Sequence, residues 1–187
     1  MSVVVIAGRK GGIGKSTIAG NLAGEFAAMG KTVAALDADP QHSLAAWAEQ
    51  GEGMLSQCVE KVSGGKSDDM RDKVRAAQKA ADIVLIDTPP GMQDVAYQAM
   101  LLADIALLPC GPSPLDLFPL KESLALALKA RAERRSKKPR NAERWRFLLA
   151  GEPPRPTRYC PTCPGVIVSS SSPFSSHQAR KRFTAAM

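Results

Sequence analysis

The sequence predicts a doubly wound α/β fold with a mostly parallel sheet, and three observations lead to that expectation. The chain has 187 residues, 44% of them hydrophobic, which is enough for one domain with a real core. Apolar runs rich in valine, isoleucine and leucine alternate with stretches of helical spacing. A glycine-rich segment follows the first run. We therefore expect one α/β domain over residues 1–150 and an irregular, basic, proline- and serine-rich tail over residues 151–187.

Each expected element has its own signal. Strands buried on both faces should be short and almost continuously apolar, which predicts strands at Val3–Ala7, Lys31–Asp37, Asp82–Asp87, Asp104–Pro109 and Trp145–Ala150. Apolar residues spaced by three and four predict helices at Ser16–Met29, Ser43–Glu49, Asp68–Ala80, Asp94–Leu102 and Pro114–Arg135. Gly30 stands where a helix commonly ends, and Pro114 suits a first helical turn.

The glycine-rich segment has the context of a phosphate-binding loop, because it joins a predicted strand to a predicted helix. Its glycines let backbone N–H groups turn towards phosphate oxygens, and the helix N-terminus adds partial positive charge. Lys15 supplies a full charge for the β- and γ-phosphates, Ser16 can coordinate Mg²⁺, and Thr17 can donate to the α-phosphate. We therefore expect binding of ATP with Mg²⁺ by Gly11, Gly12, Ile13, Gly14, Lys15, Ser16 and Thr17.

Acidic residues end two of the predicted strands. Asp37 and Asp39 close the second strand, and Asp87 follows the apolar run Ile83–Ile86. Because the carboxyl ends of parallel strands meet at one edge of a sheet, these acids are expected beside the glycine-rich loop. Asp87 is the candidate to hold Mg²⁺, with Ser16 and Asp37 in support.

The glycine-rich loop departs from the strict P-loop pattern, since its first position is Arg9 and its second is an additional lysine, Lys10. It resembles the deviant Walker A motif of the ParA/MinD family of ATPases. The segment Asp37–Gln41 is similar to that family's switch I, Asp87–Gly91 to its Walker B and switch II, and Pro109–Asp116 to the loop that packs on adenine. The resemblance covers roughly residues 1–150.

The resemblance implies a role for individual residues. Lys10 would reach across a dimer to the partner's nucleotide, and Asp39 would position or activate the attacking water. Pro112 and Ser113 would contact the base. Asp116 would either position the base or cap the following helix.

The implied function is that of the small ParA-type ATPases of plasmid or chromosome partition. Such a protein would form an ATP-dependent homodimer, bind nonspecific DNA at the nucleoid, and hydrolyse ATP slowly until stimulated by a ParB-like centromere-binding partner. Residues 1–120 carry a net charge of −4 and residues 121–187 one of +11. The cations expected to contact DNA phosphates are Lys129, Arg131, Arg134, Arg135, Lys137, Lys138 and Arg140. A solvated helix end that complements the helix dipole is the alternative.

Three other functions stay open. A MinD-like, membrane-positioned ATPase would need an amphipathic C-terminal helix, but residues 175–187 hold few apolar residues, so a membrane is an unlikely partner. Cys160 and Cys163 form one CxxC pair, which two copies could combine into a metal-cluster site. A nucleotide-binding remnant without turnover is the third. A cytoplasmic location is expected, because no apolar run approaches the length that spans a bilayer.

Overall fold

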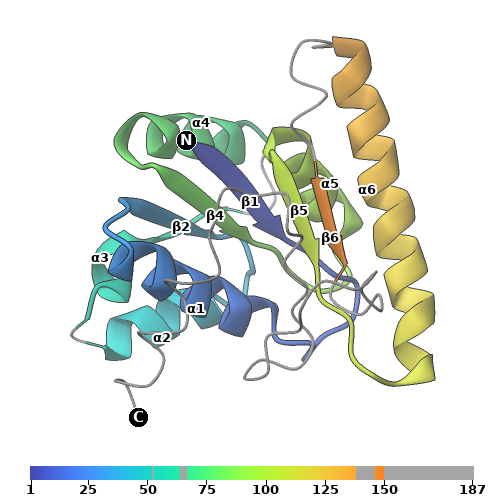
Figure 1. Ribbon diagram of the computed structural model, residues 1–187, viewed down its shortest axis with the longest axis horizontal. Helices are drawn as coiled ribbons and strands as arrows, with labels where there is room; N and C mark the ends of the chain where they lie inside the picture. Colours follow the sequence, from blue (N-terminus) through green and yellow to red (C-terminus); the bar gives the residue numbers. More distant parts are fainter. Residues whose placement is uncertain (52, 64–66, 138–145, 150–187) are drawn as a thin grey trace.

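The computed structural model describes residues 1–51, 53–63, 67–137 and 146–149, and their strands form one parallel sheet. The spatial order of the strands is β3-β2-β4-β1-β5-β6 (Figure 1). The strands are β1 (Ser2–Ile6), β2 (Val33–Asp37), β3 (Val59–Lys61), β4 (Ile83–Asp87), β5 (Ile105–Leu108) and β6 (Arg146–Leu149). The helices are α1 (Lys15–Ala28), α2 (Ser43–Gln50), α3 (Leu55–Cys58), α4 (Ser67–Ala80), α5 (Gln93–Leu102), the 3-10 turn η1 (Pro114–Asp116) and α6 (Leu117–Lys137).

The predicted fold class is confirmed, and so are the five expected strands, whose ends lie within two residues of the predicted ones. Two short elements, α3 and β3, were not predicted. Strand β3 has three residues and pairs with β2 alone, at the edge of the sheet, so it lacks the apolar run that marks the other strands. The predicted helix Pro114–Arg135 is divided into η1 and α6. The predicted tail, residues 151–187, lies outside the described residues.

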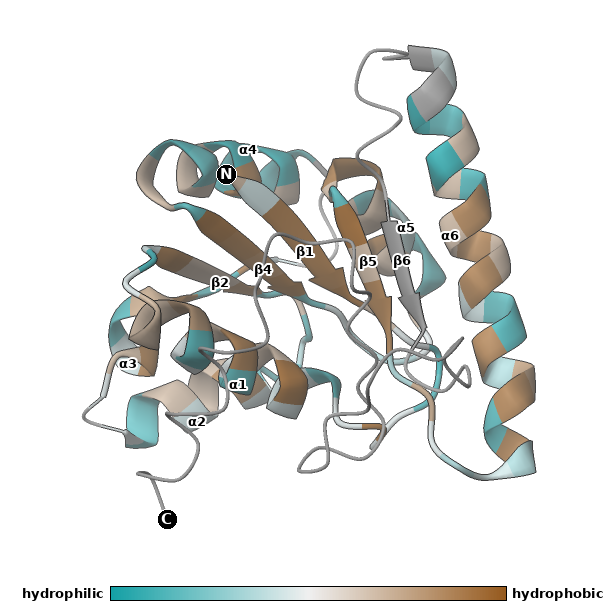
Figure 2. Ribbon diagram, in the orientation of Figure 1, coloured by the Kyte–Doolittle hydropathy of each residue, from teal (hydrophilic) through white to brown (hydrophobic). Residues whose placement is uncertain are grey.

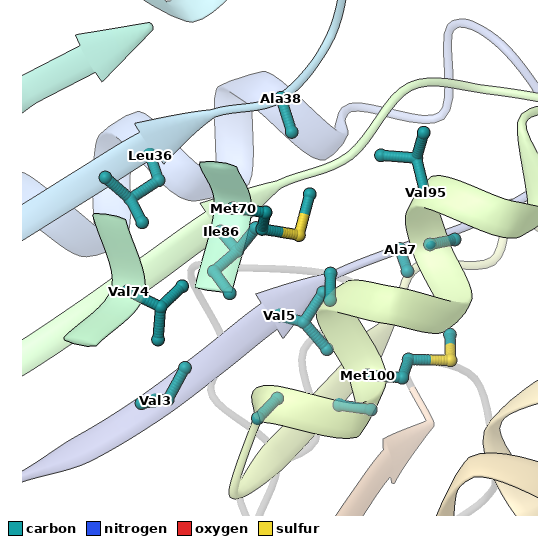
Figure 3. Packing of buried hydrophobic residues seen from close by; sticks show 14 of the residues in the cluster. Val3, Val5, Ala7, Leu36, Ala38, Met70, Val74, Ile86, Val95 and Met100 are labelled. Carbon is teal, nitrogen blue, oxygen red and sulfur yellow. The ribbon is translucent and has the colours of Figure 1, made fainter. Parts of the chain in front are cut away.

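Helices cover the sheet on both faces, and the alternation of side chains along each strand assigns residues to one core or the other. Val3 and Val5 of β1 face α4, α5 and α6, whereas Val4 and Ile6 face α1, α2 and α3. Figure 3 shows the first of these cores, where side chains of α4 and α5 meet the strands. Figure 2 shows that the strands in its centre are hydrophobic along their length. This double cover explains the nearly continuous apolar strands.

Helix α6 packs through small side chains. Its buried positions are Ser123, Ala127 and Ala130. Of the leucines spaced by three and four along the predicted helix, Leu120 and Leu124 pack against the core, whereas Leu117 and Leu128 are half exposed. No helix among the described residues is both long and apolar enough to cross a membrane.

The topology brings the phosphate loop and the acids together. Strand β1 lies between β4 and β5, so the loop that follows β1 emerges at the centre of the sheet. Ile6 is in register with Asp87, and Asp87 with Asp37, so the three strand ends lie at the same edge. Helix α1 ends at Ala28, and Gly30, which follows its C-cap residue Met29, has a φ of 75°, as expected for a left-handed glycine after a helix.

Candidate nucleotide-binding site

The glycine-rich loop presents the start of α1 to its concave side. Gly14 is the N-cap of α1 and contributes no side chain, and the N–H of Ile18 makes the first helical bond to its carbonyl at 2.8 Å. Gly12 and Gly14 have φ of 72° and 85°, where a side chain would be strained. The first N–H groups of α1 are thus left without a side-chain cap, as a helix that binds phosphate requires.

Lys15 is a buried cation beside two acids. Its Nζ donates to the carbonyl of Lys10 at 3.2 Å. Burial lowers the pKa of Lys15, and the nearby charges of Asp87 and Asp39 oppose that effect. The predicted role of Lys15, binding of the β- and γ-phosphates, stays a prediction.

Asp87 is a buried acid whose ionised form is costly. Its side chain is 1% exposed, and within the described residues neither carboxylate oxygen has a hydrogen-bond partner. Burial raises the pKa of Asp87 to about 6, although the nearby Ser16 hydroxyl and Lys15 favour the charged form. A buried carboxylate without partners, next to a serine hydroxyl, fits a divalent cation.

The described residues contain no cluster of three or more acidic, histidine or cysteine side chains arranged to hold a metal. Mg²⁺ is usually bound by one or two carboxylates, with water and substrate phosphates completing the shell.

The switch I segment is held differently from Asp87. Both oxygens of the buried Asp37 accept backbone N–H groups, one from Asp39 at 3.1 Å and one from Ala45 at 2.9 Å. Asp39 in turn accepts the N–H of Gln41 at 2.9 Å through its side chain. Asp39 thus lies in a folded turn, and its charge is close enough to Lys15 to affect the pKa of that lysine. The predicted support of Mg²⁺ by Asp37 stays a prediction.

Lys10 contacts the loop after β5. Its ammonium pairs with the buried carboxylate of Asp116, and this pairing lowers the pKa of Asp116. A Cβ at Gly111 would lie 2.2 Å from an oxygen of Asp116, so the loop needs glycine there. Ser113, and not Asp116, caps η1, accepting the N–H of Leu115 at 3.3 Å. The predicted base contacts of Pro112 and Ser113 stay predictions.

The phosphate loop is also tied to α6, which sequence reasoning missed. The backbone N–H of Arg9 donates to Ser123 Oγ at 3.2 Å, and its guanidinium pairs with Glu122 at 2.5 Å. These residues are 114 and 113 positions apart in the sequence. The only signal in the sequence was the unusual arginine at the first loop position.

Two cations of the predicted DNA-binding set are engaged within the chain. Lys129 lies over the ring of Tyr97, 5.1 Å from its centroid, and Arg134 pairs with Asp104 at 3.4 Å. Arg131 is half-buried. The side chains of Arg135 and Lys137, and residues 138–140, lie outside the described part, as do Cys160 and Cys163.

The glycine-rich loop, the buried Lys15 and the unpartnered acid Asp87 define a P-loop nucleotide-binding protein. Residues 4–167 match the family described as CbiA, the CobQ/CobB/MinD/ParA nucleotide binding domain. The chain belongs to this family, as its loop, switch and Walker B segments led us to expect.

Two relatives of known name are similar over the same part of the chain. The maintenance of carboxysome distribution protein A of Gloeobacter kilaueensis is 36% identical over 127 residues, which are 67% of this chain and 56% of the relative. The protein ParA of Rhizobium radiobacter is 33% identical over 126 residues, with the same two shares. The chain spans just over half the length of these relatives.

Solved structures share the fold at lower identity. The cobyrinic acid a,c-diamide synthase of Mycobacterium smegmatis with bound ADP and magnesium has a TM-score of 0.62 at 14% identity, covering 80% of this chain and 73% of its own. The pNOB8 ParA bound to nonspecific DNA has a TM-score of 0.54 at 18% identity, covering 68% and 60%. Both show the fold, and nucleotide with magnesium occurs among such neighbours.

Proposed function

We propose that the chain is a Mg²⁺-dependent ATPase of the partition type, which dimerises with ATP and then binds DNA nonspecifically. The observation that carries this proposal is the buried, unpartnered carboxylate of Asp87 beside Lys15 in a loop with the additional lysine Lys10. In such a protein hydrolysis is slow alone and is stimulated by a ParB-like centromere-binding partner at the nucleoid.

The residues divide the chemistry among them. Lys15 and the N-terminus of α1 hold the phosphates, because both present positive charge to them. Ser16 and Asp87 would hold Mg²⁺, which when bound supplies charge neutralisation on the β- and γ-phosphates. Asp39 orients the attacking water and accepts its proton. Lys10 leaves Asp116 to contact the nucleotide of the second copy.

Charge distribution supports the DNA-binding half of the proposal. The net charge of +11 in residues 121–187 is large enough to give an affinity that falls steeply with salt. Lys129 and Arg134 are partly engaged within α6 and its neighbours, so Arg135, Lys137, Lys138 and Arg140 are the stronger candidates for phosphate contacts. The relative ParA of Rhizobium radiobacter and the structure of a ParA on DNA support the same function.

A second candidate is the positioning of a protein compartment, because one relative at 36% identity is named for carboxysome distribution. The two candidates differ in what is positioned: DNA in the first case and a protein compartment in the second.

The decisive experiment is binding to random-sequence duplex DNA at low salt with Mg²⁺ and either ATP or ADP. We expect binding with ATP only, which weakens as salt is raised. The variant Lys15→Met, folded but deficient in ATP binding, is the matched control and should not bind DNA. Absence of binding by the native chain in both nucleotide states would contradict the DNA function. Liposome sedimentation, metal analysis and ATP hydrolysis assays then separate the membrane, cluster and remnant alternatives.

A further inference from the structure

Asp37 is a fully buried carboxylate whose two oxygens are both used by the backbone of the following segment. One oxygen accepts the N–H of Asp39 at 3.1 Å and the other accepts the N–H of Ala45 at 2.9 Å. Asp37 therefore holds the segment from Asp39 to Ala45 by hydrogen bonds at its two ends, six residues apart. A carboxylate that accepts two N–H groups loses much less by burial than one without partners.

The second of these contacts replaces a missing helix cap. The N-cap of α2 is His42, which has φ 49° and makes no side-chain cap bond. Ala45 is the third residue of α2, whose N–H is the one that a capping side chain usually satisfies. Asp37 supplies that acceptor from the end of β2, and its negative charge also suits the N-terminus of the helix.

The segment held by these two hydrogen bonds carries the residue expected to orient water. The N–H of His42 donates to the carbonyl of Asp39 at 2.8 Å, and the N–H of Gln41 to the Asp39 side chain at 2.9 Å. At the far side of α2, the ring of Trp47 lies so close to α1 that a Cβ at Gly20 would be 2.3 Å from it. Helix α2 is thus held at its first turn by Asp37 and at its middle by Trp47, and the turn that contains Asp39 leads directly into it.

Asp87 provides the contrast, because it lies in register with Asp37 on the neighbouring strand. Asp87 has no hydrogen-bond partner among the described residues, while each oxygen of Asp37 accepts one backbone N–H. We propose that Asp37 is a positioning residue that sets the place of Asp39 and the start of α2 for hydrolysis, and does not bind the cation. This inference rests on the proposed function.

The test is Asp37→Asn, which keeps the size of the side chain but turns one acceptor into a donor that faces an N–H. We expect kcat for ATP hydrolysis to fall about tenfold or more, because the water-orienting group is displaced. The affinity for ATP and the Mg²⁺ concentration for half-maximal binding should change by less than about twofold. Amide hydrogen exchange should accelerate at Asp39 and Ala45.

Asp82→Ala is the control, because Asp82 also accepts a backbone N–H, that of Thr32 at 3.1 Å, at the opposite edge of the sheet, and alanine removes that acceptor. It should accelerate exchange at Thr32 and leave kcat unchanged. If Asp37→Asn does not fold, Ala45→Pro removes the N–H donor itself at the third position of α2, where that N–H has no intrahelical partner to lose. It should lower kcat in the same direction.

The outcomes are separable. Unchanged exchange at Asp39 and Ala45, or a raised Mg²⁺ requirement with unchanged exchange, would overturn the inference and favour a role of Asp37 at the cation. Unchanged kcat with accelerated exchange would also overturn it. A third outcome is that the native chain hydrolyses no ATP while exchange is accelerated in Asp37→Asn. That outcome would support the contacts of Asp37 with the segment and would overturn the proposed function instead.

Discussion

Two acidic residues at the amino edge of the sheet are held in the opposite way to Asp87 at the carboxyl edge. At the amino edge, Asp82 accepts the N–H and the hydroxyl of Thr32, and Asp104 accepts the N–H of Val3 while pairing with Arg134. At the carboxyl edge, Asp87 is buried without a partner. The two acids of the amino edge therefore stabilise the fold, whereas the ionised form of Asp87 is costly until a proton or a bound cation neutralises it.

The largest expected effect is a gain of stability from Asp87→Asn. A raised pKa means that the folded protein binds this proton more tightly than the unfolded chain, so the unfolding free energy falls as pH rises from about 4 to about 6. Above that range the ionised acid costs about 3 kcal/mol. The variant should therefore be more stable than the native chain by most of this free energy near neutral pH, and by almost nothing near pH 4.

Urea denaturation at the two pH values measures the difference. Thr88→Ser, which keeps a buried hydroxyl next to an intact Asp87, is the control, and its stability difference from the native chain should be the same at both pH values. An Asp87→Asn variant that is no more stable than the native chain near neutral pH would mean that Asp87 is not strained, and the contrast between the edges would disappear.

The next effect is a loss of stability at the amino edge. Asp104→Ala leaves the N–H of Val3 without an acceptor and removes the partner of Arg134. We expect the unfolding free energy to fall by about 1–3 kcal/mol, since a partly buried donor is left unsatisfied. ATP affinity, measured by titration of the same protein, should not change. Asp104→Asn keeps one acceptor and should lose less; equal losses would exclude the N–H contact as the cause.

The smallest effect concerns Asp116→Asn, which releases Lys10 from its intramolecular partner. Because a depressed carboxyl pKa stabilises the fold above the unfolded pKa and not below it, the small loss of stability should vanish in acid. Light scattering with ATP should show slightly more dimer, since Lys10 is free to cross to a second copy. Glu122→Gln, which breaks only the Arg9 pair, should not. A fall in ATP affinity would instead assign Asp116 to the base.

Local patterns predicted the parallel sheet, the phosphate loop and the three acids, because each depends on residues that are neighbours in the sequence. They did not predict β3, whose three residues are defined by pairing with β2. Nor did they predict the Lys10–Asp116 and Arg9–Ser123 contacts, which depend on how α6 packs. Asp37 and Asp87 look alike in sequence, and only the folded backbone distinguishes the hydrogen-bonded acid from the unpartnered one.

Trp47 gives the molecule an optical property of its own. It belongs to the helix that follows switch I, rests on the helix that follows the phosphate loop, and is 45% exposed. The chain has one other tryptophan, Trp145. With Trp145 replaced by phenylalanine, intrinsic fluorescence arises from the junction of these two helices, so the emission maximum becomes a label-free signal for whatever moves α2 against α1.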